Sequence, residues 1–133
     1  MRATVEICSI DDVPESLQAL TDREPSAWVA LRAVDTTPGG KLRVHAGRLA
    51  GQEVPGPKGR LAAELRVAPG AQVTVWVNDE YEHHVLDQSE GLRLEGVALK
   101  PGQVGRIAAG HLAVTVRNTG EETGRALLFG RVA

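Results

Sequence analysis

The chain has 133 residues, 42% of them hydrophobic, which is enough for a single domain with one sizeable core. Lys and Arg number 15 against 17 Asp and Glu, so the net charge is −2 and no basic stripe is present to neutralise a phosphate backbone. Trp, Tyr and Phe together make up only 3% of the chain, too little for a base-stacking platform, and a nucleic-acid partner is therefore excluded.

Residues 1–36 differ from the rest of the chain, because they hold three basic and seven acidic residues. Residues 13–20 are predicted to form one short helix. Asp11 and Asp12 can cap it, Pro14 suits its first turn, and Glu15 suits its positive end. A strand is predicted at residues 27–34.

From residue 37 onward, glycine and proline divide the chain into short segments in which apolar residues alternate with polar ones. Residues 51–59 contain three glycines and two prolines, and we expect them to form a loop over one end of the fold. The predicted strands are residues 42–46, 61–67, 72–77, 82–86, 92–95, 104–108, 111–117 and 125–132. Short strands at this spacing predict an all-β sandwich or barrel.

The order of these short elements is similar to that of a known family. The segments that carry the similarity are Leu42-Arg43-Val44-His45-Ala46-Gly47, Pro69-Gly70-Ala71, Tyr81-Glu82-His83-His84-Val85-Leu86, Leu99-Lys100-Pro101-Gly102 and Arg125-Ala126-Leu127-Leu128-Phe129-Gly130. Residues 41–133 thereby resemble the C-terminal cupin domain of pirin-like, quercetinase-like proteins.

This resemblance implies a cupin-like antiparallel β-barrel, or jelly roll, of two sheets with a pocket between them at one end. Pirin-like proteins usually hold an iron-type metal in a separate N-terminal domain, for which residues 1–40 are too short. Some members oxidise flavonols and others act as protein-binding regulators. We expect one cupin-like domain over residues 1–133, with residues 1–36 as a helix and strand extension and residues 37–133 as the barrel.

Cupins that bind metal present His-x-His on one strand, a following Glu and a distant His, because alternate strand residues face the same side. This sequence has no His-x-His. Placed without gaps, the His-x-His positions fall near Thr74 and Trp76, the Glu position near Tyr81, and the distant His near Ala113 rather than His111. We therefore expect no cofactor, although a one-residue bulge could shift any of these positions. The alternative is iron or another divalent transition metal.

A displaced metal site is the rival interpretation, built from Glu82, His83 or His84 together with His45 or His111. Adjacent strand residues point to opposite faces, so His83 and His84 cannot both be ligands on a regular strand. Glu82 and His84 share a face. With His111, they are the residues that we would assign to a metal if one is bound.

Tyr81 and His83 are expected to point into the barrel, with Trp76 nearby. A neutral imidazole beside a phenol and an indole can bind a flat or carbonyl-bearing molecule, or act as a general base near pH 7. Trp76, Tyr81, His83 and His45 are therefore the candidate ligand-binding residues, and His83 with Tyr81 the candidate catalytic pair. The competing interpretation is that these are polar residues that only close one end of the barrel.

No apolar run approaches the roughly 18 residues that cross a bilayer, and no secretory signal is expected, so we predict no membrane partner. Cys8 is the single cysteine, which fits a reducing, cytoplasmic location. Exposed edge strands predict a homodimer.

Together these features predict a metal-free cupin domain that binds a small molecule or a protein partner in or near the barrel mouth. The alternative is a small cupin enzyme, an oxygenase, isomerase or cyclase, acting on an aromatic or carbonyl substrate. It would use His83 as base or a metal held by Glu82 and His84. A third interpretation is a piece of a larger bicupin in which residues 1–36 form a docking segment.

Overall fold

A computed structural model describes residues 4–32 and 38–132. The strands are β1 (Glu6–Ser9), β2 (Val29–Arg32), β3 (Pro38–Leu49), β4 (Gln52–Val54), β5 (Arg60–Val67), β6 (Gln72–Trp76), β7 (Tyr81–Asp87), β8 (Leu92–Leu94), β9 (Val97–Ala98), β10 (Gln103–Ile107), β11 (Ala113–Asn118) and β12 (Gly124–Val132). The helical turns are η1 (Ile10–Asp12), α1 (Glu15–Gln18) and η2 (Ala19–Asp22). The predicted all-β class is confirmed.

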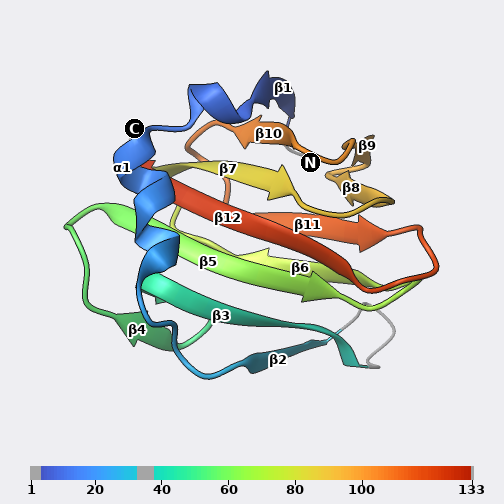
Figure 1. Cartoon of the computed structure of the whole chain (residues 1–133), viewed down its shortest axis with the longest axis horizontal. Helices are drawn as coiled ribbons and strands as arrows, with labels where there is room; N and C mark the ends of the chain where they lie inside the picture. The colour runs from blue at the N-terminus through green and yellow to red at the C-terminus, as the bar shows by residue number, and fades with distance from the viewer. Residues whose placement is uncertain (1–3, 33–37, 133) are drawn as a thin grey trace.

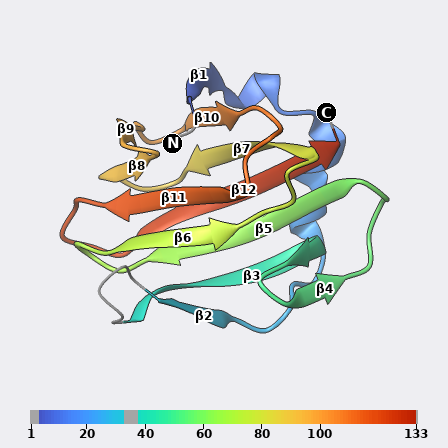
Figure 2. The same cartoon turned by 180° about the vertical axis from the view of Figure 1, so that it is seen from behind.

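Two antiparallel sheets face each other. The large sheet has the order β1-β10-β7-β12-β5-β3-β2, with β4 paired to β3, and the small sheet has the order β6-β11-β8-β9. Figure 1 shows the large sheet in front, and Figure 2 shows the small sheet from the opposite side. The predicted jelly-roll barrel corresponds to this pair of sheets.

The main core lies between the two sheets. It is built from inward-facing aliphatic residues, such as Leu65 and Val67 on β5 and Val73 and Val75 on β6, all at most 2% exposed. Each of these pairs is separated by one residue, which is the period expected when alternate side chains face one side of a strand. Whether a side chain lies in the barrel interior therefore depends on the odd or even position of its residue along the strand.

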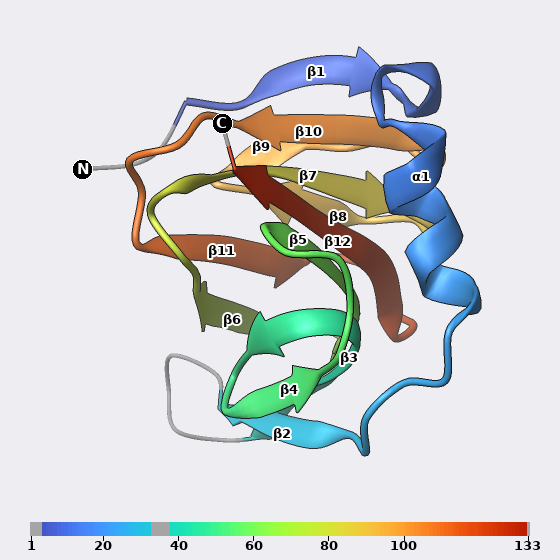
Figure 3. The same ribbon diagram turned by 90° about the vertical axis from the view of Figure 1, so that its left-hand side faces the viewer.

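A second core lies on the outer face of the large sheet, beneath the N-terminal helical turns. Leu17 and Leu20 pack there with Ala62 and Phe129. Figure 3, turned by 90° from the view of Figure 1, shows these turns covering the large sheet on the side away from the small sheet. Because this face is covered in part, several outer positions of β5, β7 and β12 are buried, such as Ala62, His84 and Phe129 at 0%, 2% and 1% exposed.

The N-terminal segment is more closely integrated into the barrel than expected. β1 pairs with β10 and β2 pairs with β3, so this segment supplies both edge strands of the large sheet. β1 was not predicted. The helix α1 is only one turn long, and its N-cap residue, Pro14, makes no side-chain capping hydrogen bond. Asp11 and Asp12, the predicted caps, lie instead in the preceding turn η1, which Ser9 caps: its Oγ accepts from Asp11 N at 3.0 Å, while Asp12 accepts from Ser9 N at 2.9 Å. The described part of this segment therefore packs on its own barrel, and a docking role for residues 1–36 stays a prediction.

The stretch of residues 51–59 is not a loop throughout. Its first part forms β4, which folds back on the end of β3 in a hairpin. Ala50 and Gly51 form the connection with φ values of +51° and +78°, the left-handed pair that a tight hairpin turn requires. The sequence did not indicate this hairpin turn, because Ala50 stands at the first turn position, where Asn or Gly is usual.

Within the described parts of the chain, no helix is both long and apolar enough to cross a membrane. The cytoplasmic location stays a prediction.

Candidate functional site

Strand β7 divides its polar residues between the two faces of the large sheet. His83 lies opposite Gly130 of β12, on the inner face, whereas His84 lies opposite Phe129 and Arg106, on the outer face. Tyr81 shares the inner face with His83, and Glu82 shares the outer face with His84. The sequence predicted this division correctly, so the two adjacent histidines belong to different environments.

His83 is buried inside the barrel, with 1% of its surface exposed. Its ring centroid lies 6.2 Å from that of the half-buried Tyr81. Gly130 makes room for both rings, since a Cβ built there would lie 3.1 Å from a ring carbon of each. The Nε2 atom of His83 is buried and has no hydrogen-bond partner among the described residues. An unpaired polar atom therefore lies within an aliphatic core.

The environment of His83 sets its charge. Burial, followed by the neighbouring His84, lowers its pKa to about 4, because the positive form is poorly solvated there. The imidazole is therefore neutral at pH 7. A buried base with this pKa removes protons weakly at neutral pH, and the structure does not place His83 in the open pocket that a catalytic base needs.

Glu82 is occupied on the outer face of the sheet. Its carboxylate accepts from Arg131 Nε at 2.5 Å and from Arg106 Nη2 at 2.8 Å. Burial acts to raise its pKa, but these two guanidinium groups outweigh burial and lower it. His84 is also buried on this face, and burial is the main cause that lowers its pKa. Its Nδ1 has no hydrogen-bond partner among the described residues. Glu82 is thus the centre of an ion-pair network rather than a free ligand.

The metal set of Glu82, His84 and His111 is not assembled. His111 lies on the turn between β10 and β11, and residues 4–32 and 38–132 contain no group of three His, Cys, Asp or Glu side chains able to hold a metal. The expected His-x-His positions, Thr74 and Trp76, face outward, and Val73 and Val75 take the inward positions of β6. On the inner face of β7, His83 and the buried Asp87 lie four residues apart, and the described residues bring no group of three donors together there, which does not fit a metal site.

Two further candidates lie away from His83. Trp76 is 72% exposed on the outer face of the small sheet, so it does not line the barrel interior near Tyr81. His45 lies on the outer face of the large sheet, where its Nδ1 is 2.8 Å from Arg23 O and its Nε2 is 2.6 Å from Glu64. Of the four candidate ligand-binding residues, the structure brings together only Tyr81 and His83.

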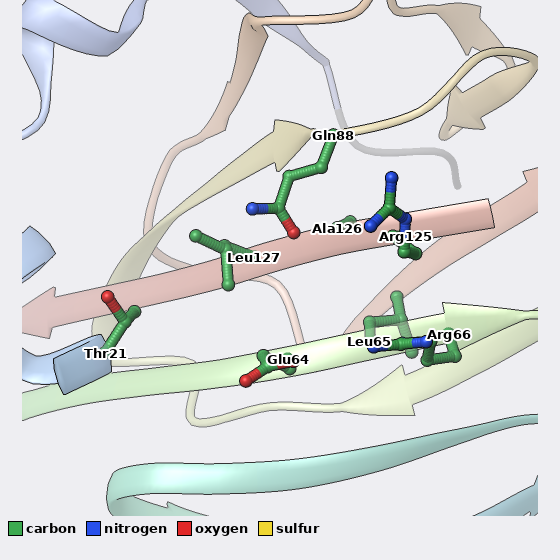
Figure 4. Close-up of a pocket in the computed structure, with 8 residues that line it drawn as sticks. All are labelled: Thr21, Glu64, Leu65, Arg66, Gln88, Arg125, Ala126 and Leu127. Atoms are coloured by element: carbon green, nitrogen blue, oxygen red, sulfur yellow. The ribbon is translucent and has the colours of Figure 1, made fainter. Parts of the chain in front are cut away.

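A groove on the outer face of β5 and β12 was missed. It has a volume of about 280 Å³. Its lining residues, drawn in Figure 4, are Thr21, Glu64, Leu65, Arg66, Gln88, Arg125, Ala126 and Leu127. The outward alternation of the arginines was visible in the sequence. Their meeting depends on the register between strands about 60 residues apart, which local patterns do not reveal.

Comparison of the sequence with models of protein families gives no match, and neither does comparison with curated proteins. Solved structures give clear matches. Quercetin 2,3-dioxygenase from Acinetobacter baumannii superposes with a TM-score of 0.66 at 16% identity, over 80% of this chain and 36% of that chain. A Cupin_2 domain of an XRE-family transcriptional regulator from Enterobacter cloacae gives 0.53 at 18% identity, over 69% and 97%. The Bacillus subtilis oxalate decarboxylase OxdC gives 0.51 at 20% identity, over 85% and 28%.

These matches define the fold as that of the cupins, and the chain spans about a third of the length of the quercetin 2,3-dioxygenase that it matches. Cupins of this shape include enzymes and a regulator domain. The more specific resemblance to pirin-like proteins stays a prediction.

The expectation of no cofactor is corrected by the same matches. A structure of the Bacillus subtilis oxalate decarboxylase is described by its Mn(II) centres, so metal dependence occurs among the proteins that share this fold. The missing sequence motif therefore does not show that a chain of this fold is free of metal. The described residues identify no ligand set for it, and we assign none.

Proposed function

We propose that this cupin domain binds a small hydroxyl- or carbonyl-bearing molecule at His83, at the end of the barrel where β7 begins. His83 is 1% exposed, so the side chains around it must move to admit the molecule. The observation that carries the proposal is the buried, unpaired Nε2 of His83. Leaving such an atom without a partner costs about 1–3 kcal/mol, so a group that hydrogen-bonds to it binds with a corresponding advantage.

The surroundings select the chemistry of the ligand. A neutral imidazole offers Nε2 either as an acceptor for a hydroxyl or as a donor to a carbonyl. The neighbouring side chains of the inner face are aliphatic, such as Val75 on β6 and Leu128 on β12, and they favour an apolar body. Tyr81 is half-buried and its ring centroid lies 6.2 Å from that of His83, so the proposed ligand would enter past this ring.

Binding is favoured over proton abstraction for a physical reason. The pKa of His83 is lowered to about 4, which makes the imidazole a poor base at pH 7 but leaves it a good neutral hydrogen-bonding group. Glu82, the carboxylate next to it in sequence, faces the other side of the sheet and is held by two arginines. The pair Tyr81 and His83 is therefore proposed as a recognition element.

The test uses matched ligand pairs that differ in one oxygen, phenol against toluene and benzyl alcohol against ethylbenzene. Binding is measured by NMR titration of the protein. We expect the oxygen-bearing member to bind about tenfold more tightly, which is the value of one buried hydrogen bond. His83→Leu should abolish this preference, and His84→Leu, which changes the adjacent buried histidine on the outer face, should keep it. Equal binding within each pair, or no binding of either member, would contradict the proposal.

A homodimer also stays a proposal. The large apolar side chains Trp76 and Leu112 are 72% and 61% exposed, and the backbone of Leu112 pairs with Val77, next to Trp76. Exposed apolar side chains that lie together are typical of contact surfaces. Light scattering at micromolar concentration should report twice the chain mass, and Trp76→Ser should shift it toward one chain mass. A wild-type monomer would exclude the dimer.

A further inference from the structure

Three cationic side chains form a row across the outer face of the large sheet. Lys41 of β3 lies directly opposite Arg66 of β5, and Arg66 lies directly opposite Arg125 of β12. Neighbouring strands are about 4.8 Å apart, so the three positions span about 10 Å. Like charges at directly opposite positions destabilise a sheet unless something neutralises them.

Two side chains of this row, together with Arg43, lie against the ring of Trp28. The charged groups of Lys41, Arg43 and Arg66 lie 4.9, 4.5 and 5.3 Å from its ring centroid. Cation–π contacts of this kind hold the side chains in place without neutralising them. Lys41 and Arg66, two of the three cations in the row, are therefore held against Trp28 before any ligand arrives.

Among the residues that the structure describes, no carboxylate neutralises the row. Glu64 lies in the same groove, but it is paired with Arg43 at 3.0 Å and with His45 at 2.6 Å. Within residues 4–32 and 38–132, neither Lys41, Arg66 nor Arg125 has a carboxylate within 4.0 Å. In the same part of the chain, the buried Nε atom of Arg66 has no hydrogen-bond partner.

The groove over this row offers further donors. Gln88 continues the row on the far side of Arg125, since its N–H donates to Arg125 O at 2.9 Å. In Figure 4 its amide reaches over β12 beside Arg125, while Arg66 lies on β5 below and Thr21 closes the end near the helical turns. Guanidinium, amide and hydroxyl groups together match the oxygen atoms of an anion.

We propose that this groove binds a small organic anion with carboxylate or phosphate groups, bridged between Arg66 and Arg125. Its volume of about 280 Å³ suits a small molecule. Glu90, Glu121 and Glu122 line the hollow that adjoins it, and their negative charge disfavours an extended polyanion such as a nucleic acid. The site is separate from His83, which faces the other side of the sheet.

The test is calorimetric titration of the full chain with citrate and with pyrophosphate, at an ionic strength held constant with sodium chloride. We expect saturable binding that Arg66→Gln and Arg125→Gln each weaken by about tenfold or more. Arg117→Gln is the matched control, because Arg117 also lies opposite an arginine, Arg93, but on the small sheet. It should leave the affinity unchanged, and so should His83→Leu.

A second measurement separates binding from a structural role. Without ligand, Arg125→Gln should melt at the same temperature as the wild type or higher, because it removes a like-charge opposition. With citrate, only the wild type should gain stability. The proposal is overturned if Arg125→Gln melts lower without ligand and gains as much from citrate as the wild type. Heats that vanish at matched ionic strength, or that Arg117→Gln reduces equally, overturn it as well.

Discussion

Each face of the large sheet contains a buried histidine, but the two faces differ in how that histidine is hydrogen-bonded. On the inner face, His83 lies beside the Tyr81 ring, and its Nε2 has no hydrogen-bond partner among the described residues. On the outer face, His45 is as well covered, at 4% exposed, but both its ring nitrogens face acceptors, Arg23 O and Glu64. Burial alone therefore does not make a histidine a candidate site.

The difference teaches where function is to be sought in this fold. The polar groups of the outer face are mostly satisfied by one another, as Glu82 is by Arg106 and Arg131. Among the described residues the buried exceptions are Nε2 of His83 and Oδ2 of Asp87 on the inner face, and Nδ1 of His84 and Nε of Arg66 on the outer face. Of these, we propose His83 and the row around Arg66 as the places where a ligand supplies what the chain does not. The following predictions test this contrast, starting with the largest effect.

The stability of the fold should depend on pH through His83. Its pKa falls from 6.5 to about 4 on folding, so between these values the unfolded chain binds a proton that the folded chain does not. Stability is therefore lost as the pH falls from 6.5 toward 4, by up to about 3 kcal/mol. Urea denaturation of the wild type and His83→Leu across this range measures it.

The difference between the two proteins isolates His83, because Glu64 and Glu82 have lowered pKa values in both and lose stability in acid alike. As the pH falls, the wild type should lose more stability than His83→Leu. Parallel stability curves would mean that His83 is not buried in the neutral form.

The close packing of His83 and Tyr81 over Gly130 should make a side chain at residue 130 costly. A Cβ added at this glycine would lie 3.1 Å from a carbon of each ring, so Gly130→Val should destabilise the fold by about 2 kcal/mol through overpacking. His83→Ala in the same chain should restore part of the loss, because it removes one of the two rings. Additive effects in this double-mutant cycle would show that the two residues are not in contact.

The outer network should respond to the loss of one charge. Glu64→Gln replaces the carboxylate that accepts from Arg43 and lies 2.6 Å from His45. We expect a loss of about 1–2 kcal/mol at pH 7 in thermal or urea unfolding, since Glu64 is mostly covered and its two partners lose a charged acceptor. If Glu64→Gln destabilised the fold no more than the loss of an exposed carboxylate does, this network would contribute no more than an ordinary surface ion pair.

The exposed carboxylate for that comparison is Glu53, whose pair with Arg48 at 3.4 Å is 67% and 79% exposed. Glu53→Gln should have no measurable effect, because solvent screens the pair. A loss equal to that of Glu64→Gln would remove the distinction between covered and exposed pairs on this sheet.

Much of this fold was readable from alternation in the sequence. The strand at residues 72–77 was predicted from Val73, Val75 and Val77 on one face, and it appears as β6 with Val73 and Val75 in the core. β1 and β4 were missed for different reasons. β1 is an edge strand whose four residues are at most half-buried, and β4 lies within a glycine- and proline-rich stretch. Their pairing depends on distant strands rather than on their own composition.

The site was predictable only in part. The opposite orientations of His83 and His84 followed from the period of two, and the structure agrees. The placement of Trp76 near Tyr81 did not, because closeness in sequence says nothing across a turn between two sheets. The row of Lys41, Arg66 and Arg125 needed the register of three strands, which non-local pairing determines.

The most direct test of the account is an NMR spectrum of the histidine ring nitrogens, recorded at pH 7 with and without phenol. We predict that His83 is neutral, that its Nε2 resonance moves as phenol is added, and that His84 does not respond. A protonated His83 at pH 7, or a bound phenol that leaves its Nε2 resonance unchanged, would contradict the proposal that this atom is the recognition point of the barrel.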